Sequence, residues 1–447
     1  MPQRNLLILL TAIAVSVVCY AAGEQNPYAR YVARSLSTIN REALHRVPSS
    51  ELHDSATTAM VRVLRRHGDE HSQFIAREIA DPFRTEISQQ FGGIGVRIRF
   101  VGDPPELVIV GEPEPATPAA QAGIRSGDHV LEIDGRPSAE MSMLEVLRAI
   151  RGKPGEPVRL LVRHADQDRP ERKEIIREVI VVDSILGDRR GENGAWEYRL
   201  EDDPRIAHVR LTTFGNKTTA ELARAFEQLQ SEGVSAAVLD LRDDAGGALD
   251  TAIAICDMLL PDGLTIVEIR GRDGVLYDRY ETTGKGRFQD LPLVVLVNQN
   301  SASASEIVAA CLQDHSRAAV VGQRTYGKGT VQKVIPVESG RSLLKLTTAS
   351  YWRPSGKNIH RAPGAKDADD WGVSPDPGLE APLTDEEHEA FLEYRAARDL
   401  WGDIPPGAFK TGSVPNGDEA TAAPFEDRQL QRAVEHLQQL LDAGDAA

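Results

Sequence analysis

The sequence is poor in cysteine, in basic charge and in long apolar runs, and each shortage excludes a class of protein. Only three cysteines occur among 447 residues, which excludes a small scaffold held together by disulfides. Lysine and arginine number 51 against 67 acidic residues, so the formal net charge is −16 and nucleic acid is not an expected partner. Metal-ligand spacings of histidine and cysteine are also missing, and neither a metal nor another cofactor is expected.

The one long apolar run lies at the N-terminus. Arg4 precedes an apolar stretch that runs from Leu6 to Val18 and continues to Ala22, where small residues end it. This order is typical of a secretory signal peptide, so we expect an exported protein in the periplasm or another extracytoplasmic space. An uncleaved membrane anchor is the alternative, and contact with a membrane is expected through this segment alone.

The other two cysteines, Cys256 and Cys311, lie among apolar residues in predicted helices. Buried, unreactive thiols are the expected outcome at such positions. A disulfide between them is the alternative in an oxidising compartment.

The pattern of apolar and polar residues changes several times along the chain, as expected of a multidomain protein. The composition, with 41% hydrophobic and 26% charged residues, is that of a globular protein. After the export segment (1–24), residues 25–88 are predicted to be helical. Short β-type runs separated by glycine and proline turns predict a compact β-rich module over 89–184. Buried apolar strands alternate with helices over 185–385, which predicts an α/β domain with a largely parallel sheet. Residues 386–447 return to polar helical and linker sequence.

A cluster of serines in the α/β domain predicts a nucleophile. The apolar strand Leu293–Val297 leads into Ser301–Glu306 (Ser-Ala-Ser-Ala-Ser-Glu), and a helical pattern follows directly. This order places a serine hydroxyl at a helix N-terminus, where unpaired N–H groups favour negative charge. The alternative for any single serine here is an ordinary helix cap.

A glycine-flanked lysine downstream is the candidate general base. Lys328 stands between two glycines and precedes a β-type run. Residues two apart on a strand face the same way, so Lys328, Thr330 and Gln332 are expected to point together. Loss of water around the ammonium would lower its pKa and leave a neutral amine that can take the serine proton. A solvated turn lysine is the alternative.

A third candidate feature follows the strand Ala236–Leu241. Gly246 and Gly247 end a turn at the carboxyl edge of the sheet, where open α/β sheets bind ligands. Their backbone N–H groups would suit an oxyanion hole.

Together these motifs resemble those of the carboxyl-terminal processing peptidases, also called tail-specific proteases. The resemblance spans residues 69–376 and implies a crotonase- or ClpP-like α/β protease core joined to a PDZ domain. Its motifs are Phe91–Gly95, Pro118–Asp128, Ile150–Gly155, Ser301–Ile307, Gln313–Asp314, Thr325–Gln332, Leu344–Ala349 and Arg353–Gly356.

The resemblance also implies a role for individual residues. The family's nucleophile matches Ser303, its lysine matches Lys328 and its supporting glutamine matches Gln332. Asp314 matches an aspartate that we expect to give structural support. The implied oxyanion donors are the backbone N–H groups of Ala304 and of Gly246 or Gly247. The implied peptide-binding positions of the PDZ domain are Phe91, Gly92, Gly93, Ile94, Gly95, Val96 and Leu147, with Ile94, Val96 and Leu147 lining an apolar pocket.

These assignments imply a serine endopeptidase that cleaves exported proteins near their C-termini through an acyl-enzyme. Its substrates would have apolar C-termini that the PDZ domain captures by strand addition. Two alternatives are a non-catalytic PDZ scaffold with a degenerate protease fold and a crotonase-like acyl-CoA enzyme. His315 and His360 lack a persuasive carboxylate partner and are expected at the surface. The terminal helical regions are candidates for self-association as a homodimer.

The sequence departs from the family pattern beside the proposed oxyanion hole. The family usually has Asn-Asn-Pro before the paired glycines, whereas this chain has Asp243, Asp244 and Ala245. A carboxylate aimed at the oxyanion would oppose the charge that develops there. We therefore expect both side chains to point away, either pairing with Arg242 or holding the turn.

Overall fold

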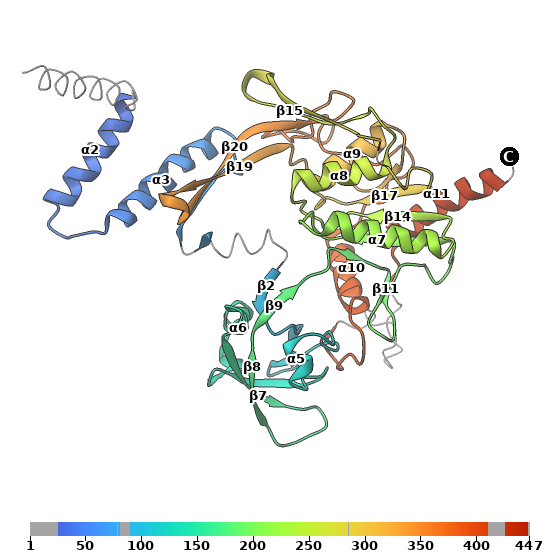
Figure 1. Ribbon diagram of the computed structural model, residues 1–447, viewed down its shortest axis with the longest axis horizontal. Helices are drawn as coiled ribbons and strands as arrows, with labels where there is room; N and C mark the ends of the chain where they lie inside the picture. The colour runs from blue at the N-terminus through green and yellow to red at the C-terminus, as the bar shows by residue number, and fades with distance from the viewer. Residues whose placement is uncertain (1–25, 78, 81–89, 285, 410–424, 446–447) are drawn as a thin grey trace, which may run out of the picture. The chain divides into compact units, whose positions relative to one another are not determined.

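The computed structural model describes residues 26–77, 79–80, 90–284, 286–409 and 425–445, so the expected export segment (1–24) lies outside the described residues. The chain divides into two compact units (Figure 1). Unit 1 comprises residues 1–77 and 333–346, and unit 2 comprises residues 78–332 and 347–447. Within the described part of the chain, no helix combines the length and the apolar character needed to span a membrane.

Unit 1 contains two of the helices predicted near the N-terminus. Helix α2 (Pro27–Glu42) begins after Asn26, whose side chain accepts a hydrogen bond from the Tyr28 N–H at 3.0 Å. A short loop leads to α3 (Ser49–Arg66), and strand β1 (Gln73–Ile75) then pairs with the first half of β20 (Ser342–Trp352). Helix α2 is amphipathic and buries no residue.

The β-rich module expected over 89–184 forms within unit 2. One antiparallel sheet has the order β3-β4-β5-β7-β8, with β6 beside β5, and a separate ladder pairs β2 with β9. Helix α6 begins with the capping box of Ser142 and Glu145. The elements of the β-rich module are β2 (Gln90–Gly93), β3 (Ile98–Val101), β4 (Glu106–Ile109), α5 (Pro118–Gln121), β5 (His129–Ile133), β6 (Arg136–Pro137), the 3-10 turn η1 (Ser138–Glu140), α6 (Met143–Ile150), β7 (Pro157–Arg163), β8 (Glu171–Ile176) and β9 (Glu178–Val181).

The α/β domain contains the largely parallel sheet that the sequence predicts. Its strand order is β10-β13-β14-β17-β18, in which β10 is antiparallel and the other four strands are parallel. The strands are β10 (Ile185–Leu186), β13 (Ile206–Leu211), β14 (Ala236–Asp240), β17 (Leu293–Val297) and β18 (Ala319–Gly322), and the helices between them are α7 (Thr218–Ser231), α8 (Leu249–Leu259) and α9 (Ala304–Asp314).

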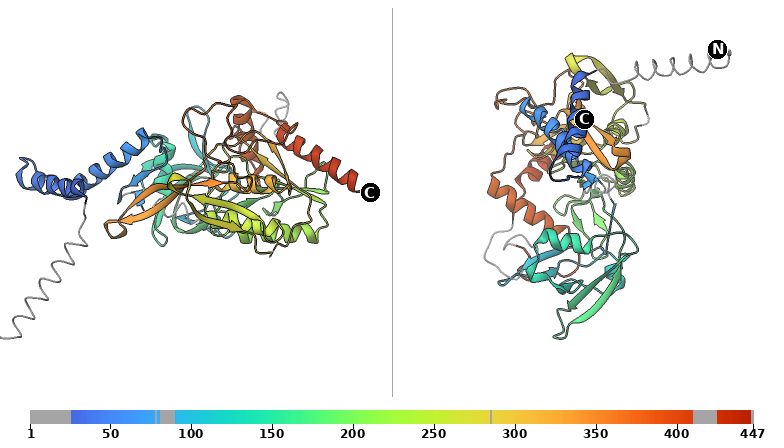
Figure 2. Two further views of the ribbon diagram at one scale, coloured as in Figure 1. Left: turned by 90° about the horizontal axis from the view of Figure 1, so that it is seen from above. Right: turned by 90° about the vertical axis from the view of Figure 1, so that its left-hand side faces the viewer.

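Helices cover both faces of this sheet, because alternate strand residues enter two different cores. Val209, Leu239 and Val295 belong to the core under α7, α8 and α9. Val238 and Val294 face the opposite core, which α11 (Arg428–Asp445) covers, as Figures 1 and 2 show. The C-terminal helix, which the sequence suggested was merely polar, is therefore part of the α/β domain.

Further strands and a helix make up the rest of the described chain. Strand β15 pairs with β16 and with the end of β20, and β19 also pairs with β20. The remaining elements are β11 (Arg189–Arg190), β12 (Trp196–Glu197), β15 (Thr265–Arg270), the 3-10 turn η2 (Arg272–Gly274), β16 (Leu276–Glu281), β19 (Thr330–Val337), the 3-10 turn η3 (Glu338–Gly340) and α10 (Asp385–Arg398).

Candidate active site

Ser303 occupies a strained position at the start of α9. Its backbone angles are φ 59° and ψ −113°, a conformation that costs a non-glycine residue about 1–3 kcal/mol. Such strain is found where a strand turns sharply into a helix to present a nucleophile. The neighbouring serines have structural tasks, since the Ser301 hydroxyl donates to the Leu241 carbonyl and the Ser305 hydroxyl to the Asp244 carbonyl. Ser303 is therefore distinguished from Ser301 and Ser305 by its strained backbone, and it is the candidate nucleophile of the motif.

One buried side chain, Glu306, joins the Ser303 turn to the lysine segment. One carboxylate oxygen accepts the N–H groups of Ser303 (2.9 Å) and Lys328 (2.7 Å). The other accepts the Thr325 hydroxyl (2.6 Å) and the Gly327 N–H (2.7 Å). The side chain is fully buried, and burial raises the pKa of Glu306 to about 7 despite these donors. Glu306 thus fixes the backbones of the candidate nucleophile and base relative to one another.

Sequence reasoning gave Glu306 no role, although a signal for it was present. Ser303 and Glu306 form a Ser-x-x-Glu pattern, in which the glutamate reaches back to the backbone N–H of the first residue. That pattern predicts the bond to Ser303. It does not predict the bonds to Gly327 and Lys328, which lie more than twenty residues away along the chain.

The glycines around Lys328 are required by close backbone packing. Gly327 has φ 85°, and a Cβ at Gly329 would lie 2.1 Å from the backbone nitrogen of His360. Lys328 itself is half-buried. The amide nitrogen of Gln332 donates to the hydroxyl (2.8 Å) and carbonyl (3.1 Å) of Thr330, so these two side chains share a face as predicted. These bonds occupy the amide nitrogen of Gln332.

Gly246 lies directly against the Ser303 turn. A Cβ at Gly246, whose φ is 92°, would lie 2.5 Å from the Ala302 carbonyl oxygen and 2.8 Å from the Ala304 nitrogen, so only glycine fits. The Gly246 N–H donates to the Asp244 carboxyl group at 2.8 Å. That bond occupies one of the two glycine N–H groups considered for the oxyanion hole, so the Gly247 N–H is the remaining candidate beside that of Ala304.

Asp243 and Asp244 hold the turn, and neither pairs with Arg242. One carboxylate oxygen of Asp243 lies 2.7 Å from the Asn300 amide and 2.8 Å from Nε2 of His388. Asp244 is fully buried, and burial raises its pKa well above the ordinary value. A protonated Asp244 carries no charge to oppose an oxyanion. The departure from the family pattern is therefore compatible with an oxyanion hole.

Arg242 belongs to a buried ionic network beneath the turn. Its guanidinium pairs with Asp240 at 2.7 Å and with Asp427 at 2.9 Å. Burial would raise the pKa of Asp240, but Arg242 and His208 hold it far below its ordinary range. His208 lies between Asp240 (2.9 Å) and Asp188 (3.0 Å). The network ties the strand that leads into the turn to the start of the C-terminal helix.

Asp314 lies far from Ser303, at the other end of α9. It forms a bidentate pair with Arg353, with a shortest distance of 2.6 Å, and accepts the Ser355 N–H at 2.9 Å. An eleven-residue helix is about 15 Å long, so Asp314 does not reach the nucleophile. It anchors the loop after β20 instead.

Two histidines and two cysteines of this region are half-buried or fully buried. His315 and His360 are half-buried, contrary to the expected surface location, and Nε2 of His315 lies 2.7 Å from the Thr265 carbonyl oxygen. Cys256 and Cys311 are fully buried free thiols, so the prediction of buried thiols is confirmed and the alternative disulfide is not formed.

The expected peptide-binding residues surround β2. Phe91, Gly92 and Gly93 lie in this strand opposite β9, and a Cβ at Gly92 would lie 2.0 Å from the Gly152 carbonyl oxygen. The Ile94 side chain is fully buried in the core of the β-rich module, so it is not an open pocket wall. The other expected positions are half-buried, namely Gly95, Val96 and Leu147.

Comparison with known proteins identifies both parts of unit 2. Residues 205–377 match peptidase family S41, and residues 109–164 match the PDZ domain. A carboxy-terminal-processing protease of Bartonella bacilliformis is 36% identical over 320 residues, which cover 70% of this chain and 67% of the relative. A carboxyl-terminal-processing protease of Picosynechococcus sp. is 31% identical over 350 residues, covering 78% and 79%.

A solved structure of a photosystem II D1 C-terminal processing protease aligns with 80% of this chain and 94% of its own, at 25% identity and a TM-score of 0.44. The sequence matches support the peptidase and neither of the two alternative functions. Proteins and peptides are therefore the substrates. The chain belongs to peptidase family S41, as a carboxyl-terminal-processing serine protease that carries a PDZ domain.

Proposed function

We propose that this peptidase uses Ser303 as its nucleophile and Lys328 as its general base. The observation that carries the proposal is the bridge through Glu306, whose single carboxylate oxygen accepts the backbone N–H groups of both residues. Two segments 25 positions apart in the chain are thereby held together at the carboxyl edge of the parallel sheet, where ligands of such sheets bind.

In this mechanism the Ser303 oxygen attacks the peptide carbonyl while its proton passes to the neutral Lys328 amine. The oxyanion accepts hydrogen bonds from the N–H groups of Ala304 and Gly247. As the C–N bond breaks, the Lys328 ammonium returns the proton to the leaving amine and the acyl-enzyme remains. Water then attacks the ester carbonyl while Lys328 takes its proton. As the ester C–O bond breaks, the Lys328 ammonium returns that proton to the Ser303 oxygen, which restores the hydroxyl and releases the carboxylic acid. The amide oxygen of Gln332 would orient the amine throughout.

Substitution of the two residues tests this assignment. Ser303→Ala should lower kcat/KM on a protein substrate by about a thousandfold or more while circular dichroism and the unfolding midpoint stay unchanged. Ser231→Ala, at an exposed serine at the end of α7, is the matched control. Lys328→Ala should cause a similar loss and abolish labelling by a fluorophosphonate. Normal proteolysis by Ser303→Ala would refute the proposal.

The PDZ domain is proposed to capture the substrate's C-terminus. The Phe91–Val96 segment would receive the terminal carboxylate on its backbone N–H groups, and Val96 and Leu147 would contact an apolar last side chain. The tight packing of Gly92 against Gly152 supports this role, because it holds the loop backbone in one conformation. Isothermal titration with a peptide that ends in valine should show binding that C-terminal amidation abolishes.

We further propose that the protein is exported and acts in the periplasm or another extracytoplasmic space. The basic Arg4 and the apolar run from Leu6 to Ala22 support this location. Mass spectrometry of the mature N-terminus, in membrane and soluble extracytoplasmic fractions, distinguishes a cleaved signal from a retained anchor. A protein recovered only from the cytoplasm would refute export.

Two finer structural assignments complete the proposal. The α/β core is assigned to the crotonase- and ClpP-like folds, which its four parallel strands between helical layers support.

A homodimer formed through α2 is supported by the exposed side chains of Tyr28, Tyr31 and Ile39 on that helix. Sedimentation equilibrium of the wild type and of a Tyr31→Ser variant tests the dimer, and a monomeric wild type would refute it.

A further inference from the structure

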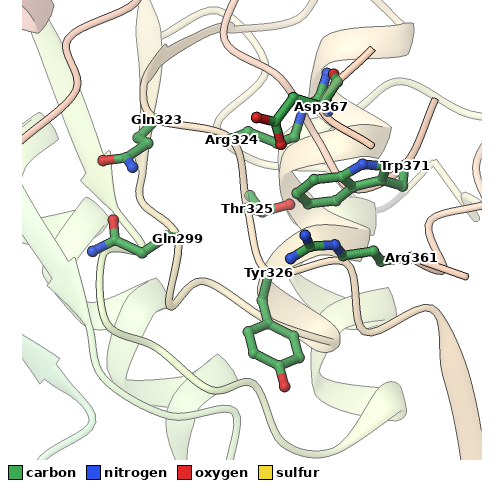
Figure 3. Close-up of a pocket in the computed structure, with 8 residues that line it drawn as sticks. All are labelled: Gln299, Gln323, Arg324, Thr325, Tyr326, Arg361, Asp367 and Trp371. Carbon is green, nitrogen blue, oxygen red and sulfur yellow. Dashed lines mark hydrogen bonds between the residues drawn. The ribbon is translucent and has the colours of Figure 1, made fainter. Parts of the chain in front are cut away.

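A pocket of about 450 Å³ borders the lysine segment and has no role in the mechanism above. Its floor is the buried indole of Trp371, which lies between two guanidinium groups, as Figure 3 shows. The Cζ atom of Arg361 is 4.5 Å from the indole and that of Arg324 is 4.6 Å away. The lining residues are Gln299, Gln323, Arg324, Thr325, Tyr326, Arg361, Asp367 and Trp371.

The two arginines leave positive charge in this pocket. Within the described chain, neither Arg324 nor Arg361 forms an ion pair with a carboxylate. Arg324 donates to the Ser374 hydroxyl and to the backbone carbonyls of Asp367 and Asp369. The Arg361 guanidinium has the aromatic face of Trp371 as its described neighbour. Asp367 contributes one negative charge at the rim, so the pocket has a net positive charge in a chain whose net charge is −16.

The pocket is tied to the catalytic segments by short backbone contacts. The Arg361 N–H donates to the Gly327 carbonyl at 2.9 Å, and the Tyr326 N–H donates to the Ser301 carbonyl at 3.0 Å. Thr325, which forms part of the wall, also donates its hydroxyl to Glu306. Thr325 and Tyr326 line the pocket and stand only three and two positions before Lys328, so a group bound there belongs to a substrate residue close to the scissile bond.

From this arrangement we infer that Arg361, with Arg324, binds a carboxylate of the substrate close to the scissile bond. Guanidinium groups bind carboxylates in a bidentate manner, and the stacked indole holds the Arg361 plane in place before substrate arrives. The carboxylate comes either from an aspartate or glutamate side chain or from the free C-terminus of the segment that is removed. The inference rests on the proposed assignment of Ser303 and Lys328.

Two peptide series distinguish these sources. The first series is amidated at its C-terminus and carries either glutamate or glutamine at each of three positions on both sides of one cleavage site. The second contains no acidic side chain and ends two or three residues after the cleavage site in a free carboxylate or an amide. The wild type should cleave the preferred carboxylate peptide with a kcat/KM about tenfold above its neutral partner.

Variants show whether the preference depends on this pocket. Arg361→Met keeps an unbranched stem against Trp371 and should reduce the preference to about unity, whereas Arg272→Gln, at an exposed arginine outside the pocket, should leave it unchanged. Asp367→Asn removes the opposing charge and should raise the preference, which tests the inference even where Arg361→Met fails to fold. Capture by the PDZ domain alone would leave the preference of Arg361→Met at the wild-type value.

The outcomes separate the inference from the proposed function. A wild type without any carboxylate preference would overturn the inference, and so would a preference that persists in Arg361→Met, provided that Ser303→Ala is inactive in the same assays. Retained cleavage by Ser303→Ala would instead overturn the proposed catalytic assignment.

Discussion

Two carboxyl groups beside Ser303, those of Glu306 and Asp244, are held in surroundings that oppose their ionisation. Burial raises the pKa of both groups, although Asp244 accepts the Gly246 N–H and Glu306 accepts three backbone N–H groups of the site. An ionised carboxylate at either position would place negative charge next to an attacking oxygen. Protonation of either group would remove a negative charge from the neighbourhood of Ser303.

Glu306 should make stability depend on pH near neutrality. Its pKa rises from 4.5 to about 7 on folding, so its contribution to stability is fully present below about pH 4.5 and is lost as the pH rises through about 7. A shift of this size corresponds to about 3 kcal/mol. The free energy of unfolding of the wild type, measured relative to Glu306→Gln, should fall by roughly that amount across this window in urea titrations. Parallel pH profiles for the two proteins would contradict the assignment.

Asp244 should act as a neutral hydrogen-bond acceptor. Asp244→Asn keeps an oxygen for the Gly246 N–H, so kcat/KM at pH 7 should stay within about threefold of the wild type. Asp244→Ala, which removes the acceptor, should lower kcat by about tenfold because the turn beside Ala304 loses its tie. A large loss in Asp244→Asn would show that the charge of the carboxylate is needed.

At this scale, local sequence indicates the proposed reacting groups but not the residues that support them. Ser303, Lys328 and Gln332 stand in compact motifs whose neighbours specify turn, helix and strand. His388 contacts Asp243 from 145 positions away along the chain, and no local sequence pattern predicts such a contact. The pairing of Asp243 with Arg242 was a natural expectation, but Arg242 is already paired with Asp240 and Asp427.

Among the elements, helix α11 contributes to the core of the α/β domain, which the sequence did not predict. The helix is polar over most of its surface, yet Ala433 and Leu437 are fully buried against the parallel sheet. Leu430, Val434 and Leu441 pack beside them, so the apolar residues recur at the helical spacing of an amphipathic helix that faces a core. The buried strands β14 and β17, in contrast, are continuously apolar and were predicted almost to the residue.

The ionic tie at the start of α11 should be worth more than a surface pair. Asp427→Ala leaves the buried Arg242 guanidinium with Asp240 as its remaining carboxylate, and we expect a loss of about 2 kcal/mol in the free energy of unfolding. Glu435→Ala, which removes the exposed partner of Arg432 on the same helix, should cost less than about 0.5 kcal/mol. Urea denaturation of both variants makes the comparison, and equal losses would refute a special role for Asp427.

At the scale of the whole molecule, helix α10 contacts two separate parts of unit 2. Glu393 pairs with Arg99 of the PDZ domain at 2.7 Å, and Arg99 also lies over the Phe409 ring. Five residues earlier on the same helix, His388 contacts Asp243 beside the oxyanion turn. One helix therefore touches both the PDZ domain and the turn that contains Asp243.

Weakening the contact between α10 and the PDZ domain should loosen that domain without unfolding the core. The pair of Arg99 and Glu393 is partly exposed, so a double-mutant cycle with Arg99→Ala and Glu393→Ala should give a coupling energy of about 1 kcal/mol. Amide hydrogen exchange should become faster in β3 while that of β17 stays unchanged. A coupling energy near zero would mean that the contact does not hold the domain.

The double use of α10 has a practical consequence for building chimeras from these enzymes. A new specificity is commonly sought by exchanging a recognition domain between relatives at its sequence boundaries. Here such an exchange would replace Arg99 and leave behind Glu393, which lies almost 300 positions later in the chain. A working hybrid should therefore take α10 and the segment through Phe409 from the donor of the PDZ domain, and keep a histidine at position 388 to meet Asp243 of the recipient.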